Sequence, residues 1–217
     1  MASSSAAELK APLERRVLAH TPGVVVCPSG LTAGELDLLI RHGDALPKES
    51  APRKYAEVAA AKMPAFADVF LAMAKQECDA DFAWLYEDQA TAAVYTKVRD
   101  LIARVNAESF GFDLTGIGAP MQFTVYEEGQ FYGWHSDMGA HTPVAHKLTL
   151  SLQLSDPAEY TGGTFETWVG HGRAPTAYPK ERGTAILYPS YILHCVTPVT
   201  RGVRKSLIAW MTGPKFR

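Results

Sequence analysis

Two side chains near the middle of the chain, His135 and Asp137, have the types and the spacing of neighbouring metal ligands. They end the stretch Gln122 to Asp137, which the pattern predicts to be a strand, a turn and a second strand. In an extended strand, alternate side chains project from the same face, so this imidazole and this carboxylate would lie side by side. A distant second histidine would complete a 2-His-1-carboxylate metal site. The candidate is His194, in a later strand-like run.

A second chemical signal is a basic residue inside an apolar strand. Arg204 and Ser206 would share one face of a segment that continues Leu-Ile-Ala-Trp, which indicates burial on both sides. A buried guanidinium is costly unless an anion pairs with it, and no acidic residue lies nearby in this strand. A carboxylate from a bound ligand would satisfy Arg204 with two parallel hydrogen bonds, and Ser206 would supply a further donor.

The elements that must position these side chains are strand-like from residue 115 onward. Residues 147–154 alternate without fault between polar residues and leucines, which predicts a half-buried strand with one polar face. Thr149 and Gln153 lie on that polar face and are candidates for contact with a bound co-substrate. Further strand-like runs follow at 164–169, 184–188, 194–199 and 203–211, separated by Gly and Pro turns. This spacing indicates an all-β barrel or double-sheet jelly roll, whose mouth is a favoured ligand site.

The first half of the chain reads as support for that core. Residues 1–15 are predicted to be a flexible tail, and a strand is expected at 23–28. Thr32 and Glu35 have the spacing of a capping box and predict a helix to about residue 42. Residues 47–64 lack periodicity and are expected to be a mobile connection that could act as a lid, followed by helices at 65–74 and 89–110.

The bulk composition predicts one globular domain over residues 1–217, with helical support at 16–114 and the β core at 115–212. Of the 217 residues, 47% are hydrophobic and 20% are charged. The net charge of -2 gives no excess of basic residues for binding nucleic acid. Three scattered cysteines indicate a reduced compartment. Because we find no secretory leader and no apolar run long enough to span a bilayer, we expect a cytoplasmic protein without membrane contact. The sequence leaves the oligomeric state open.

The combination of motifs resembles the Fe(II)/2-oxoglutarate-dependent oxygenases, in particular their prolyl 4-hydroxylase-like branch. The resemblance covers about residues 115–212. It is carried by His135-Ser136-Asp137, Leu152-Gln153-Leu154-Ser155-Asp156, Tyr160-Thr161-Gly162-Gly163, Tyr188-Pro189-Ser190, His194 and the segment from Val196 to Arg204. Two departures concern substrate identity: the collagen enzymes of this branch usually have Lys at the position of Arg204, and an acidic residue more often follows the Gly pair.

The resemblance implies a mainly β fold with flanking helices and a double-stranded β-helix core, also called a jelly roll or cupin-like core. It implies Fe(II) held by His135, Asp137 and His194, with the far carboxylate of 2-oxoglutarate held by Arg204. Tyr126 matches a family tyrosine that lines the co-substrate site. The implied reaction uses O2, with ascorbate as a reductant, and releases succinate and CO2.

Three functional hypotheses follow. The first is a hydroxylase acting on an unactivated C–H bond of an amino acid, a peptidyl residue such as proline, or a small natural product. The second is a nucleic-acid demethylase of the same superfamily, disfavoured because Trp210 stands where the demethylase signature places a second Arg. The third is a cupin-like module that binds zinc at the same three ligands, which leaves the buried Arg204 unexplained. Three other histidines in turn-rich sequence are not expected to be ligands, namely His141, His146 and His171.

Overall fold

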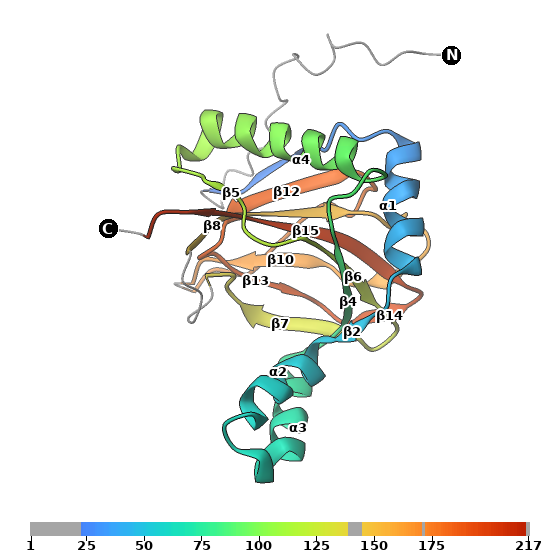
Figure 1. Ribbon diagram of the computed structural model, residues 1–217, viewed down its shortest axis with the longest axis vertical. Helices are drawn as coiled ribbons and strands as arrows, with labels where there is room; N and C mark the ends of the chain where they lie inside the picture. The colour runs from blue at the N-terminus through green and yellow to red at the C-terminus, as the bar shows by residue number, and fades with distance from the viewer. Residues whose placement is uncertain (1–22, 139–144, 171, 216–217) are drawn as a thin grey trace.

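Two β-sheets form the body of the molecule, and helices cover it on the outside (Figure 1). The computed structural model describes residues 23–138, 145–170 and 172–215. The predicted tail at 1–15, His141 and His171 lie outside the described residues. Within them, no helix is long and apolar enough to cross a membrane.

The major sheet has strands from both halves of the chain, in the order β1-β12-β8-β15-β6-β4-β2, with β5 paired to β15. Its strands are β1 (Val25–Pro28), β2 (Glu49–Ser50), β4 (Asp81–Leu85), β5 (Gly116–Ile117), β6 (Met121–Tyr126), β8 (Ala145–Gln153), β12 (Thr184–Pro189) and β15 (Arg204–Gly213). The pairs described are antiparallel, and neighbours in the sheet are mostly distant in sequence. This ordering is typical of a jelly roll.

The minor sheet has the order β11-β10-β13-β7-β3, and a two-stranded ribbon joins β14 to β9. The minor-sheet strands are β3 (Cys78–Asp79), β7 (Phe131–His135), β10 (Phe165–Trp168), β11 (Thr176–Ala177) and β13 (Leu193–Val196). The ribbon strands are β9 (Thr161–Gly162) and β14 (Val199–Arg201). The predicted mainly β, jelly-roll class is therefore confirmed.

Two helices pack on the outer face of the major sheet, α1 (Ala33–Ala45) and α4 (Ala92–Val105), and a π-helical turn, η3 (Asn106–Phe110), extends α4. The predicted capping box is present: Thr32 Oγ1 accepts from the Glu35 amide, and the Glu35 carboxylate accepts from the Thr32 amide. The leucines of β8 pack beneath these helices, so the polar face of β8 must point inward. The prediction of a half-buried strand was therefore wrong, because Thr149, Ser151 and Gln153 are also buried.

The segment expected to be a mobile connection at 47–64 instead forms β2 and the helix α2 (Ala51–Ala60). A 3-10 turn, η2 (Pro64–Phe66), joins it to α3 (Ala67–Glu77), close to the predicted 65–74 helix. The two helices form a hairpin that projects away from the sheets (Figure 1). It leaves large apolar side chains exposed, namely Tyr55, Val58, Met63, Phe66, Val69 and Met73. The helix α2 was not predicted because it buries only small residues, Ala51, Pro52 and Ala56, which mark no apolar stripe of large side chains.

The first half of the chain is also more than helical support, since β1 and β4 are integral strands of the major sheet. β1 pairs with β12, and β4 pairs with β6. These two strands place the helices α1 and α4 against the leucine face of the sheet and leave its opposite face to line the interior.

Candidate metal centre and co-substrate pocket

The two histidines are brought together by strand pairing. His135 ends β7, and its direct partner across the antiparallel ladder is His194 on β13. Their ring centroids lie 4.1 Å apart. The ladder is irregular between His194 and Val196, and such bulges recur beside active sites because they re-aim a side chain.

Both imidazole rings are oriented by the backbone of their own strands. His135 Nδ1 lies 2.8 Å from the carbonyl oxygen of Gly133, and His194 Nδ1 lies 3.0 Å from that of Ile192. A carbonyl oxygen only accepts, so each Nδ1 carries the proton and donates it. Each Nε2 is then left with its lone pair, which is the form that binds a metal.

The carboxylate comes from a turn rather than from the strand. The extended geometry predicted for residues 135–137 is wrong, since β7 ends at His135 and Asp137 lies in a turn. Two contacts fix that turn: the Asp137 amide donates to the Ser190 carbonyl at 2.8 Å, and the Asp137 carbonyl lies 2.9 Å from His146 Nδ1. His146 is thus not a solvated histidine but a partly buried residue of β8 that supports the turn.

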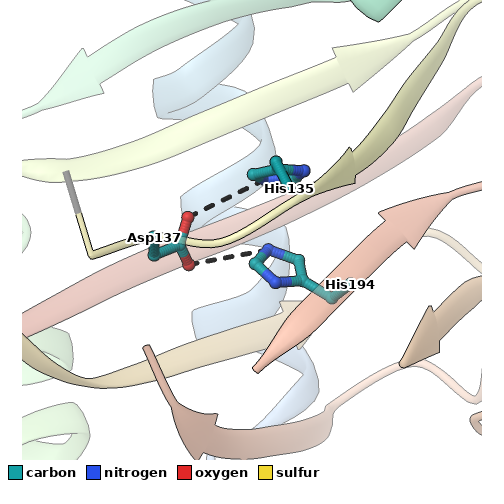
Figure 2. Close-up of side chains that lie close together, drawn as sticks. All are labelled: His135, Asp137 and His194. Atoms are coloured by element: carbon teal, nitrogen blue, oxygen red, sulfur yellow. Dashed lines mark ion pairs between the residues drawn. The ribbon is translucent and has the colours of Figure 1, made fainter. Parts of the chain in front are cut away.

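The three side chains converge, as Figure 2 shows. Asp137 Oδ1 is 3.8 Å from His135 Nε2, and Asp137 Oδ2 is 3.6 Å from His194 Nε2. One ligand atom from each residue lies within 4.8 Å of the others. Burial, and then the nearby His194, lower the pKa of His135 to about 4, so this ring is neutral at physiological pH. Two imidazoles and one carboxylate fit a divalent first-row metal that keeps open positions for other ligands.

Aromatic side chains enclose the histidines. The ring of Tyr132 stacks on His135 at 3.8 Å, and the ring of Tyr188 lies 4.8 Å from His194. The Tyr132 hydroxyl is 2.6 Å from that of Tyr55, which reaches in from α2. Position 133 of the same strand requires glycine, because a Cβ on Gly133 would lie 2.7 Å from the carbonyl oxygen of Glu77. These contacts limit the motion of the His135 ring.

Arg204 is one of the largest fully buried side chains of the described structure, at 1% exposure. Its Nη1 donates to Ser206 Oγ at 3.2 Å and its Nη2 to Gln153 Oε1 at 3.1 Å, while Nε has no partner. Within the described ranges no carboxylate lies within ion-pair distance of this guanidinium. No described acid therefore compensates the buried charge, as the sequence led us to expect for an anion-binding residue.

Two further residues shape the surroundings of Arg204. Tyr126 is its cross-strand partner, and the guanidinium carbon lies 5.2 Å from the centre of the Tyr126 ring, a cation–π contact. Burial raises the pKa of Tyr126 to about 12, so its hydroxyl keeps its proton. Gly163 has φ +55, and a Cβ there would lie 2.9 Å from Arg204 Cδ. The Gly pair, read from sequence as a turn, thus also leaves room for the arginine.

One cavity of about 290 Å³ connects the triad with Arg204. Of the residues predicted from sequence, its walls include the triad together with Tyr126, Arg204 and Ser206. Thr149 and Gln153 are positioned behind this wall and contact Asp137 and Arg204 instead. Sequence reasoning missed several aromatic wall residues, among them Trp84 and Tyr55, whose segments showed no strand or helix pattern.

A jelly roll with two histidines and one carboxylate at one end of an interior cavity has the ligand set of the non-haem Fe(II) oxygenases. Residues 121–212 match the family described as the 2OG-Fe(II) oxygenase superfamily, where 2OG is 2-oxoglutarate. Over this core the chain is similar to that superfamily, in agreement with the resemblance drawn from the sequence motifs.

Curated relatives support the assignment over part of their length. A PKHD-type hydroxylase from Sphingopyxis alaskensis is 36% identical over 111 residues, which cover 49% of this chain and 50% of the relative. The PKHD-type hydroxylase YbiX from Escherichia coli is 37% identical over 94 residues, 41% of each chain. The chain thus spans half or less of the length of these relatives.

Solved structures share the fold at low identity. A Pseudomonas putida prolyl-4-hydroxylase aligns with a TM-score of 0.54 and 18% identity, covering 84% of this chain and 99% of that one. A Trichoplax adhaerens prolyl hydroxylase, solved with a hypoxia inducible factor peptide fragment, aligns with a TM-score of 0.60 and 14% identity, covering 88% and 84%. At these identities the likeness establishes the shared fold.

Proposed function

We propose that this protein is a Fe(II)- and 2-oxoglutarate-dependent dioxygenase that hydroxylates an unactivated C–H bond. The observation that carries the proposal is the buried Arg204, which lacks a carboxylate partner among the described residues and lines the same cavity as the triad. A ligand with a carboxylate at one end and metal-binding oxygens at the other would satisfy both ends of that cavity. 2-Oxoglutarate is such a ligand.

In this proposal His135, Asp137 and His194 hold the metal, and Arg204 holds the far carboxylate of 2-oxoglutarate. Ser206 and Gln153 fix the plane of the guanidinium, and its free Nε is available to the ligand. The bound iron would supply the oxidation of substrate by O2, with release of succinate and CO2 and with ascorbate as a reductant.

The residues around the triad orient and protect it. Tyr188 donates a hydrogen bond to Asp137 Oδ2 at 3.5 Å, and Thr149 donates to the same oxygen at 2.9 Å. Together these donors hold the Asp137 carboxylate in place beside the two histidines. The ring of Tyr132 stacks on His135 and the ring of Tyr188 is tilted against His194, and both tyrosines line the cavity, where they shield the histidines from water.

For the substrate, we propose an amino acid, a peptidyl residue of proline-like shape, or a small natural product of similar size. Two features support this class. The cavity walls include Trp84, Trp210 and Phe82, which suit a compact apolar group. The relatives and neighbours that carry a substrate in their names are prolyl hydroxylases.

The test is anaerobic addition of Fe(II) and 2-oxoglutarate to the purified protein. Binding of the keto acid to iron in this site should give a weak visible charge-transfer band, and admission of O2 with ascorbate should release succinate. A zinc-binding cupin-like module would give no band with Fe(II) and 2-oxoglutarate, and that result would overturn the proposal.

A screen of succinate release against free amino acids and Pro-containing peptides would then identify the substrate. Methylated oligonucleotides belong in the same screen. Stimulation by these oligonucleotides alone would favour the demethylase hypothesis.

A further inference from the structure

Three polar side chains follow one another along the inward face of β8: Thr149, Ser151 and Gln153. Each is at most 2% exposed. As alternate residues of a strand they span about 14 Å, at about 3.4 Å per residue. The row begins at the metal centre and ends at Arg204, since Thr149 contacts Asp137 and Gln153 contacts the guanidinium.

The two end members of this row already have partners. Thr149 Oγ1 is 2.9 Å from Asp137 Oδ2 and also 2.9 Å from Ser190 Oγ, and Gln153 Oε1 accepts from Arg204 at 3.1 Å. Of the three residues, Ser151 alone lines the cavity. Thr149 and Gln153 are therefore positioning residues, which hold the triad carboxylate and the guanidinium in place.

Ser151 differs from its neighbours in having no partner. Its Oγ is buried and makes no hydrogen bond with any described residue. Its cross-strand neighbours on the two sides, Ile186 and Ile208, are apolar and offer none. A buried hydroxyl without a partner costs about 1–3 kcal/mol, so such a group in a native fold calls for an explanation. A ligand that enters the cavity would complete its hydrogen bonding.

We propose that Ser151 is a binding residue for the 2-oxo acid, donating a hydrogen bond to one of its carboxylate oxygens. The inference rests on the proposed function. A linear keto diacid held by Arg204 at one end and by the triad at the other must pass Ser151, which lies between them on β8. The oxygens of that ligand are acceptors when it is ionised, and the unused hydrogen of Ser151 is the matching donor.

The test measures binding rather than turnover. 2-Oxoglutarate is titrated calorimetrically and without O2 into the Fe(II)-loaded protein. Because a hydrogen bond to a charged group is being removed, Ser151→Ala should raise the dissociation constant about tenfold or more. The ligand-free variant should unfold at or above the wild-type temperature, since an unsatisfied buried hydroxyl has been removed.

A matched pair separates the hydroxyl from the shape of the side chain. Ser151→Thr and Ser151→Val have the same shape, and the hydroxyl is present in Thr alone. Ser151→Thr should bind 2-oxoglutarate at least about tenfold more tightly than Ser151→Val. Ser29→Ala serves as control, because it removes the hydroxyl of a buried serine that does not line this cavity. This variant should bind 2-oxoglutarate like the wild type.

The outcomes distinguish this inference from the proposed function. If the wild type does not bind 2-oxoglutarate, the proposed function fails. If Ser151→Ala binds 2-oxoglutarate as well as the wild type does, the role of Ser151 is overturned while the proposed function stands. The same holds if Ser151→Thr and Ser151→Val weaken binding equally. An equal loss in Ser29→Ala would likewise overturn the assignment to Ser151.

Discussion

His135 on β7 and His194 on β13 are direct partners in one antiparallel ladder, with their ring centroids 4.1 Å apart. The pairing of two strands thus sets the separation of the two imidazoles, and the turn after β7 adds the carboxylate. This arrangement makes the site a property of the minor sheet rather than of flexible loops, and ligand placement on paired strands is more precise than placement on loops.

Removing either imidazole should abolish the metal-dependent reaction. We expect His135→Ala and His194→Ala to release no succinate and to bind Fe(II) more than about a hundredfold more weakly, since the loss of a ligand exceeds the loss of a supporting contact. Anaerobic calorimetry with Fe(II) measures the affinity. Unchanged affinity in either variant would remove that histidine from the ligand set.

Arg204→Met should affect stability and ligand binding in opposite directions. The substitution removes an uncompensated buried charge, so the free energy of unfolding of the ligand-free protein should stay equal or rise by about 1–4 kcal/mol. The 2-oxoglutarate requirement should rise at least about thirtyfold, the expected cost of losing one partner of a buried charge pair. Urea unfolding and a titration of succinate release provide the two measurements. A 2-oxoglutarate requirement equal to that of the wild type would contradict the role given to Arg204.

Two glycines of α1 should respond oppositely to alanine. A Cβ at Gly43 would lie 2.4 Å from Cγ of Phe123, so Gly43→Ala should lower the free energy of unfolding by about 1–3 kcal/mol. Gly34 faces open space, and Gly34→Ala should raise it by about 0.5 kcal/mol because alanine is the better helix former. Urea unfolding of both variants gives the comparison, and a neutral Gly43→Ala would show that α1 shifts freely on the sheet.

The Glu35 carboxylate should stabilise the fold in a pH-dependent way. Burial raises its pKa, but the hydrogen bonds from Lys97 and Thr32 outweigh burial and hold the pKa below 4.5. A depressed pKa means stability that is present above pH 4.5 and is lost as the pH falls through the folded-state value. Glu35→Gln keeps the capping oxygen and should cost about 0.5–1 kcal/mol at pH 7, discounted for partial exposure.

The difference between wild type and Glu35→Gln should disappear at acidic pH, where the wild-type carboxyl is also neutral. Chemical unfolding at a series of pH values from 7 downward tests this. Lys97→Met removes the partner of Glu35 and should lower the free energy of unfolding through the same interaction. The effects of the two substitutions on the free energy of unfolding should therefore not be additive. A difference that is independent of pH would show that the charge is not involved.

The sequence predicted the core of this fold because periodicity and capping are local signals. The capping box at Thr32 and Glu35, the alternation of β8 and the His194 strand all stand in the structure where the pattern placed them. The α2 helix was missed because it buries only small side chains, whereas its large apolar residues Tyr55 and Val58 are exposed. The turn at Asp137 was missed because its contacts with Ser190 and His146 are tertiary.

In the candidate site, too, local sequence signals predicted some residues, whereas the roles of others depend on tertiary contacts. Residue type and spacing were sufficient to single out the triad, Arg204 and Ser206. On the polar face of β8, however, alternation does not distinguish Thr149, Ser151 and Gln153 from one another. Only the two outer residues were predicted to contact the co-substrate. The distinction between them depends on which hydroxyl or amide is already bonded, and that depends on Asp137 and Arg204, which are far away in sequence.

The two histidines stand on the minor sheet, whereas Arg204 stands on the major sheet. Under the proposed function, a keto acid held by the metal and by Arg204 would link the two sheets like a removable crosslink. The loaded protein would then be stiffer and more resistant to proteolysis than the empty one, by mass action. Cleavage of the keto acid into succinate and CO2 would break this connection between the two sheets in every cycle. The reaction itself would therefore restore the more flexible state from which the products leave.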